Sequence, residues 1–123
     1  MGAEMTQTAS VDGAKVHLHF ADYFFDLITN LSDAFEGTNV LGPKLAILMT
    51  LYSAERSSFL HTLTSLSDEA DMPHATMLRH LNEMVGRRWI MKTPDIKDNR
   101  IVYVRLAPAT MGRINGAMES LST

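Results

Sequence analysis

The chain has 123 residues, of which 46% are hydrophobic and 20% charged, as expected for one soluble globular domain with a single hydrophobic core. It contains no cysteine, which excludes disulfides, thiolate catalysis and cysteine-ligated zinc and fits a reducing cytoplasm. Its net charge of −3 excludes a uniformly basic nucleic-acid-binding chain, so any such partner requires an uneven charge distribution.

Residues 1–14 are expected to form a disordered lead-in, and a single domain is predicted over residues 15–123. No basic patch followed by an apolar core occurs in the lead-in, so no signal peptide is expected. No apolar run in the chain approaches the roughly 20 residues that a membrane span needs. The expected location is therefore the cytoplasm, with no membrane partner.

Residues 15–37 are predicted to form a first helix with a wide aromatic stripe. Its apolar residues recur at spacings of three and four, the pattern of one helix face. Two interpretations stay open: the stripe is core, or part of it contacts a second copy of the chain or a small aromatic ligand. The residues of this candidate ligand or dimer face are Phe20, Tyr23, Phe24, Leu27, Phe35 and Tyr52.

Two further helices are predicted before the middle of the chain. The first covers residues 43–56, where Pro43 suits the opening turn and the sequence is nearly all apolar. Residues 59–63 form either a short extended piece or the opening of the next helix, which is predicted over residues 65–70. Thr62 and Thr64 are alternative N-caps, and no capping box is expected at Thr64, because serine stands three residues later instead of glutamate.

A fourth helix and a hairpin are predicted within residues 73–106. Met77, Leu81 and Met84 recur at helical spacing in residues 73–87. Two strands, 89–92 and 101–106, then flank a loop of turn-forming residues. A helix followed directly by a small hairpin with a charged tip is the layout of a winged helix-turn-helix, here spanning residues 64–106. The predicted fold class is mainly α with a small β-hairpin wing (α+β), closed by a last helix over residues 108–121.

Positive charge is concentrated on the predicted helix and hairpin. Residues 1–72 carry three basic and ten acidic side chains, a net charge of −7. Residues 73–105 carry seven basic and three acidic side chains, a net charge of +4. Such a local positive surface is where DNA phosphates would be met. The alternative interpretation is a chance asymmetry of solvated charges.

The same segment contains the candidate DNA-binding residues. The major groove admits an α-helix, and Arg79 is the best candidate for a bidentate contact with guanine. Lys97 and Arg100 flank a hairpin tip that can reach the minor groove, and Asp98 is expected to orient the Arg100 guanidinium through a charge-assisted hydrogen bond. The candidate set comprises His74, Ala75, Thr76, Arg79 and His80 on the helix, Lys97, Asp98, Asn99 and Arg100 in the wing, and Thr64, Ser65, Arg87 and Lys92 as phosphate contacts.

Residues 41–110 resemble the winged helix-turn-helix of the MarR-type transcriptional regulators. The resemblance lies in Leu41-Gly42-Pro43 ahead of the motif, in the segments SLSDEADM and PHATMLRHLNEMV, and in the wing KDNR followed by IVYVRLAPAT. In that family an Asp-x-Arg sequence precedes a strand ending in Leu-Thr-Pro, and here the wing reads Asp98-Asn99-Arg100 before Leu106-Ala107-Pro108. The resemblance implies a homodimer that binds a palindromic operator and is released by small phenolic or other ligands.

Three features depart from that family's pattern. Family members often have glycine where Arg88 stands, and His80 occupies a position that is usually apolar. The predicted C-terminal helix is also short, which leaves the aromatic first helix to supply most of a dimer contact.

Neither a metal site nor an enzymatic activity is expected. His17 and His19 are two residues apart, and His74 and His80 are six apart, so neither pair has the spacing that brings two imidazoles of a helix to one ion. No nucleophile with an adjacent base and no glycine-rich phosphate loop occurs. The leading hypothesis is a cofactor-free, sequence-specific transcriptional regulator. The alternative is a winged-helix protein-interaction module that modulates another regulator without specific DNA binding.

Overall fold

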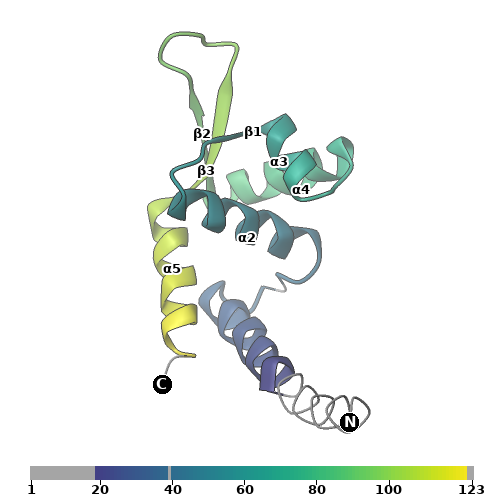
Figure 1. The fold of residues 1–123 in the computed structure, drawn as a ribbon, viewed down its shortest axis with the longest axis vertical. Helices are drawn as coiled ribbons and strands as arrows, with labels where there is room; N and C mark the ends of the chain where they lie inside the picture. The colour runs from purple at the N-terminus through teal and green to yellow at the C-terminus, as the bar shows by residue number, and fades with distance from the viewer. Residues whose placement is uncertain (1–18, 39, 122–123) are drawn as a thin grey trace, which may run out of the picture.

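The computed structural model describes residues 19–38 and 40–121 (Figure 1). The predicted lead-in at residues 1–14 lies outside the described residues, as do residues 15–18 of the first predicted helix. That N-terminal helix is described over residues 19–34. The elements that follow are α2 (Pro43–Arg56), β1 (His61–Thr62), α3 (Leu63–Glu69), α4 (His74–Gly86), β2 (Ile90–Pro94), β3 (Val102–Leu106) and α5 (Pro108–Glu119).

The arrangement is that of a winged helix, which confirms the predicted fold class. The β2–β3 hairpin projects from one end of the molecule, and the N-terminal helix extends from the other end beside α5 (Figure 1). Helices α2, α3 and α4 lie between them and pack against the base of the sheet. Within the described residues, no helix combines the length and apolar character that crossing a membrane requires.

The sheet has three antiparallel strands in the order β1–β3–β2. In β1, His61 pairs with Val104, and at the base of the hairpin Ile90 pairs with Leu106. The pairing continues to Pro94 opposite Val102, so the first wing strand is longer than its sequence predicts. Because His61 and Thr62 form β1, these two residues before α3 are extended and do not open that helix.

One hydrophobic core joins the helices to the sheet. Helix α4 buries the three residues that its periodicity selects, because positions three and four apart share a helix face. The N-terminal helix contributes the buried Leu31, and Leu27 packs half-buried against the core. Fully buried members include Leu31, Phe35, Ile47, Leu48, Leu51, Leu66, Met77, Leu81, Met84 and Ile114.

Helix α3 begins earlier than predicted, at Leu63, with Thr62 as its N-cap. The Thr62 Oγ1 accepts a hydrogen bond from the Ser65 N–H at 3.2 Å, and the Ser65 hydroxyl accepts one from the Thr62 N–H at 2.9 Å. This is a capping box in which serine replaces the usual glutamate. The alternative cap, Thr64, lies inside the helix.

The end of α4 has a backbone conformation that favours glycine, although Arg88 occupies it. Arg88 has a φ of +64°, in the left-handed region that glycine favours. Its N–H bonds to the Val85 carbonyl at 3.0 Å, and the Trp89 N–H bonds to the Met84 carbonyl at 2.9 Å. These two bonds form a Schellman motif. The turn directs Trp89 into the core and sets the direction of β2.

Candidate nucleic-acid interface

Arg79 lies on the solvent side of α4. It follows the buried Met77 by two residues, which places it roughly 200° around the helix, almost opposite the core. Ala75, Leu78 and Asn82 share that side at spacings of three and four, and all are exposed. Among the described residues, the Arg79 guanidinium has no hydrogen-bond or ion-pair partner, so it can contact a ligand without breaking an internal bond.

This side of α4 is joined to the first wing strand. The Lys92 Nζ on β2 donates a hydrogen bond to the Asn82 Oδ1 at 3.4 Å. The contact makes the exposed side of α4 and the base of the hairpin one surface. Asn82 and Leu78 were not among the predicted site residues, although their three- and four-residue spacing from Arg79 and Ala75 could have indicated them.

Thr76 and His80 lie on the flank of α4 that faces α2. Their neighbour on that flank, Glu83, forms an ion pair with Lys44 of α2 at 3.3 Å. The His80 Nδ1 is buried and has no hydrogen-bond partner within the described structure. Burial, and then the charges of Lys44 and Arg79, lower the pKa of His80. The ring is therefore neutral at pH 7 and partly covered, whereas His74 is exposed at the start of the helix.

The predicted phosphate contacts differ in how free their side chains are. Thr64 is exposed, whereas Ser65 is occupied by the capping box and by the His61 Nδ1 at 2.9 Å. The Arg87 guanidinium lies 5.2 Å from the Trp89 ring centroid, and its Nε is 3.5 Å from a Glu83 oxygen. Arg87 thus supports the turn after α4, and Thr64 is the freer of the hydroxyl groups.

The wing tip is held in shape by Asp95. Its Oδ2 accepts hydrogen bonds from the N–H groups of Lys97 and Asp98, both at 3.0 Å. The Tyr103 hydroxyl donates to the Asp95 Oδ1 at 3.1 Å. These bonds, led by the two from the backbone, lower the pKa of Asp95, and the bond to Asp95 raises the pKa of Tyr103. Asp95, which was not predicted as a site residue, therefore positions the tip.

Asp98 orients Arg100 as expected. The Arg100 Nε and Nη2 donate to the two Asp98 carboxylate oxygens, each at 3.1 Å, and the Arg100 N–H donates to the same carboxylate at 3.0 Å. The side-chain bonds from Arg100 are the main reason that the pKa of Asp98 is lowered. The Arg100 side chain stays 90% exposed. It is therefore oriented but open to a partner.

The rest of the tip is also open to solvent. Lys97 and Asn99 are exposed, and Ile96 is 99% exposed, which the sequence reasoning did not single out. A polar tip that presents one apolar side chain can contact the sugar edges of a groove as well as the phosphates.

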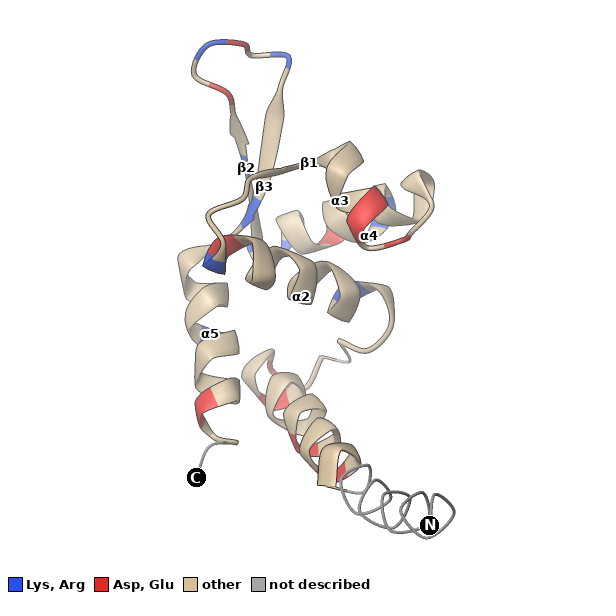
Figure 2. Ribbon diagram, in the orientation of Figure 1, with Lys and Arg blue, Asp and Glu red and all other residues tan. Residues whose placement is uncertain are grey.

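Acidic and basic residues are unevenly distributed along the molecule. Figure 2 shows Lys and Arg beside Asp95 and Asp98 in the hairpin, but Asp and Glu without Lys or Arg along the described N-terminal helix. Within described residues 19–38 there are four acidic side chains and no Lys or Arg. Because the hairpin and the N-terminal helix lie at opposite ends, the acidic helix is kept away from a ligand bound at the wing.

The predicted ligand or dimer face divides into two parts. Phe20, Tyr23 and Phe24 are exposed on the N-terminal helix, and so is Phe25, which the prediction omitted. Leu27 is half-buried and packs against the core.

The placement of Phe35 on that face was wrong. Phe35 is 1% exposed, and its ring meets the Trp89 ring edge-on with centroids 4.8 Å apart. The Arg113 guanidinium lies over it at 5.6 Å. The helix has ended by this residue, and the turn directs the ring into the core. Tyr52 is half-buried, and its hydroxyl donates to the Asn115 Oδ1 at 2.8 Å, so it joins α2 to α5.

The fold and this surface define a winged-helix protein, and solved structures show the same fold. RV1404 from Mycobacterium tuberculosis matches with a TM-score of 0.73 and 14% identity, covering 92% of this chain and 73% of that one. A MepR variant from S. aureus bound to an oligodeoxyribonucleotide matches with a TM-score of 0.67 and 14% identity, covering 89% and 75%. YusO from Bacillus subtilis matches with a TM-score of 0.65 and 12% identity, covering 94% and 79%.

At these identities the likeness concerns the fold. No protein-family model matches the sequence, and no curated protein matches it significantly.

Proposed function

We propose that this protein is a cytoplasmic, sequence-specific DNA-binding transcriptional regulator of the MarR type, without enzymatic activity. The observation that carries the proposal is the continuous surface from the exposed side of α4, through the Asn82–Lys92 contact, to the wing with its oriented Arg100. A helix and a hairpin joined in this way match a major groove and the adjacent minor groove. The oligodeoxyribonucleotide complex of the similarly folded MepR variant supports this assignment.

The chemistry of the surface matches direct readout of base edges. Arg79 presents two parallel donors that suit the O6 and N7 of guanine, and Asn82 presents the donor and acceptor that suit adenine. Lys92 holds Asn82 in place, and Thr64 can donate to a phosphate at the start of α3. In the minor groove, Arg100 reads shape and negative potential.

The same proposal includes a homodimer on a palindromic site. The exposed aromatic residues Phe20, Tyr23, Phe24 and Phe25 lie at the end of the molecule opposite the wing, so a contact between two copies there leaves both α4 helices free for DNA. Two-fold symmetry then places the two half-sites about 10 base pairs, or a multiple of that distance, apart.

Responsiveness to a small aromatic ligand is the remaining part of the proposal. Exposed aromatic rings on the N-terminal helix can stack on such a ligand. A thermal-shift screen with aromatic acids measures this directly, because a ligand that binds only the folded protein raises its unfolding temperature. If no compound in the screen raises the unfolding temperature, the proposed response to an aromatic ligand is refuted.

Selection from a random pool of double-stranded DNA, followed by gel shifts, tests DNA binding. Arg79→Ala is expected to weaken binding of the selected site by about 1–3 kcal/mol, because one bidentate base contact is lost. Lys97→Ala is expected to weaken all sequences alike and to reduce the salt slope by about one. Arg56→Ala, at the exposed end of α2, is the matched control and should bind like the wild type.

The outcome that contradicts the proposal is the absence of any sequence preference, or unchanged binding in both test variants. Failure of the protein to bind DNA-cellulose at low salt would instead favour the winged-helix protein-interaction module. Retention with a steep salt dependence excludes that alternative.

A further inference from the structure

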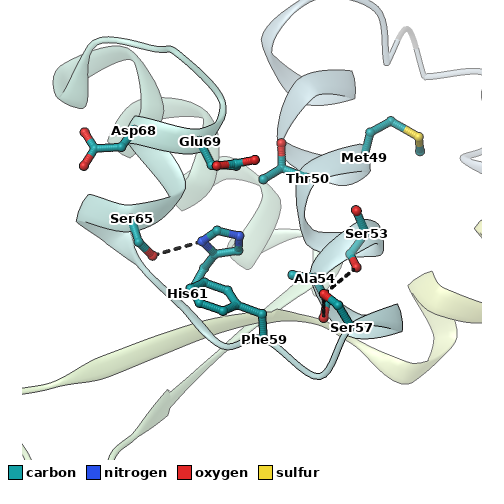
Figure 3. Close-up of a pocket in the computed structure, with 10 residues that line it drawn as sticks. All are labelled: Met49, Thr50, Ser53, Ala54, Ser57, Phe59, His61, Ser65, Asp68 and Glu69. Atoms are coloured by element: carbon teal, nitrogen blue, oxygen red, sulfur yellow. Dashed lines mark hydrogen bonds between the residues drawn. The ribbon is translucent and has the colours of Figure 1, made fainter.

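A cavity of about 690 Å³ opens between α2, β1 and α3 (Figure 3). This volume lies within the range of small-molecule sites, roughly 300–1,000 Å³. Its apolar lining residues are Met49 and Ala54 of α2 and Phe59, which is 54% exposed. None of the exposed aromatic residues of the N-terminal helix lines it, so it is separate from the predicted ligand face.

A buried histidine faces this cavity with one nitrogen unused. His61 is only 6% exposed, and its ring meets the Phe59 ring edge-on with centroids 4.7 Å apart. Its Nδ1 is bonded to the Ser65 hydroxyl, but among the described residues its Nε2 has no hydrogen-bond partner. Figure 3 shows the ring between Ser65 and the Glu69 carboxylate. This nitrogen belongs to a residue that lines the cavity, so a ligand in the cavity can donate a hydrogen bond to it.

The hydrogen bonds around Ser65 indicate which ring nitrogen carries the proton. The Ser65 hydroxyl lies 3.2 Å from the Thr62 carbonyl oxygen, to which it can donate its one hydrogen. The His61 Nδ1–H then donates to Ser65, which leaves Nε2 as an acceptor. Burial lowers the pKa of His61, which keeps the ring neutral and this lone pair available at pH 7.

The fixed charge at the cavity is negative. Both Asp68 and Glu69 line the cavity, and the Glu69 carboxylate points toward Thr50, whereas the Asp68 carboxylate points in the opposite direction (Figure 3). Neither carboxylate forms an ion pair with any described residue, and the cavity lining includes no Lys or Arg. An acceptor nitrogen, a carboxylate and apolar side chains together suit a donor-rich, positively charged group attached to an apolar body.

We propose that the cavity binds a small organic cation, an ammonium group carried on an apolar or aromatic skeleton. The ammonium donates hydrogen bonds to the Glu69 carboxylate and to the His61 Nε2. Its skeleton packs against Met49, Ala54 and the Phe59 ring.

The cavity is connected to the wing and to α3, the helix that precedes α4. The His61 backbone pairs with Val104 on the wing strand β3, and its Nδ1 is bonded to Ser65, which completes the capping box of α3. A ligand at the His61 Nε2 therefore contacts the residue that links α3 to the wing. Occupancy is expected to change DNA affinity, and this regulatory part rests on the proposed function.

Titration of the full chain with 2-phenylethylammonium, followed by amide NMR shifts, tests the binding site. A dissociation constant on the order of 1 mM is expected for a ligand of this size, with shifts concentrated in residues 49–69. The matched probe 3-phenylpropionate, which has the opposite charge, is expected to bind at least about 10-fold more weakly. Equal binding of the two probes, shifts centred elsewhere, or no binding overturns the proposal.

Two neighbouring carboxylates provide matched variants. Glu69→Gln is expected to weaken binding of the ammonium probe by about 10-fold, because the charge of its anchor is removed. Asp68→Asn removes the same charge from a side chain that points in the opposite direction and should weaken binding less than about 3-fold. Equal losses in the two variants contradict the role of Glu69.

The regulatory part is tested by DNA binding with the ammonium probe at saturation. The DNA affinity of the wild type is expected to change by at least about 3-fold, and that of Glu69→Gln to change less at the same probe concentration, because its site is only partly occupied. An unchanged wild-type affinity overturns the regulatory part. Because the NMR titration contains no DNA, a protein that fails to bind DNA refutes the proposed function without affecting the ligand result.

Discussion

Replacing Arg88 with glycine is expected to stabilise the protein. Arg88 is held at a φ of +64°, a conformation that costs a non-glycine residue about 1–2 kcal/mol. Glycine adopts it freely but adds about 0.5–1 kcal/mol of backbone entropy to the unfolded chain. The Arg88 side chain is exposed and forms no hydrogen bond or ion pair with the described residues, so little else is lost. The net gain is about 0.5–1 kcal/mol.

Urea unfolding measures this gain. With an unchanged slope, the midpoint for Arg88→Gly is expected to rise by roughly 0.3–0.6 M. The control Arg88→Ala keeps a Cβ atom in the strained backbone and should stay within about 0.5 kcal/mol of the wild type. The reasoning is refuted if glycine destabilises the protein or if alanine stabilises it equally. Binding of the selected DNA site should be weakened less than in Arg79→Ala, because Arg88 is not among the candidate contacts and glycine retains the turn that directs β2.

Three further predictions concern the cap, the core and the pH dependence. Thr62→Ala is expected to lower the free energy of unfolding by about 1 kcal/mol, whereas Thr64→Ala changes it by less than about 0.5 kcal/mol; urea titrations that give equal losses would contradict the assigned cap. Phe35→Ala is expected to cost about 3–5 kcal/mol as a core deletion, whereas Phe24→Ala leaves monomer stability unchanged and weakens self-association in analytical ultracentrifugation. The pKa of His61 is lower in the folded protein than its ordinary 6.5, so the unfolded chain binds more protons as the pH falls. The contribution of His61 to the free energy of unfolding is therefore complete above pH 6.5 and is lost as the pH falls toward the pKa of His61 in the folded protein. His61→Asn should show a weaker pH dependence of unfolding than the wild type, and equal pH profiles would count against this.

The parts of the candidate site that were predictable depend on residues close together in the chain. The Asp98–Arg100 pair formed as expected, because two residues in a tight turn can meet without help from another element. The position of Arg79 on the solvent side of α4 follows from its spacing relative to Met77 and Leu81. The capping box at Thr62 was missed because serine, unlike glutamate, is a weak signal for that motif.

The contacts that were not predictable join distant elements. The Asn82–Lys92 contact depends on the angle between α4 and β2, which the left-handed turn at Arg88 sets. The lowered pKa of His80 depends on burial and on the charge of Lys44 of α2, more than thirty residues earlier in the chain.

The sequence by itself determined the order of helices and strands, the charged wing and the solvent side of α4, because periodicity, turn residues and short-range bonds are local properties of the chain. Only the tertiary structure decided that Phe35 belongs to the core while Phe24 stays exposed, although both lie on one apolar stripe. The cavity beside His61 also exists only in the tertiary structure, because its lining residues come from separate elements that pack together. Burial is a property of how elements pack, and a stripe of apolar residues does not specify what covers it.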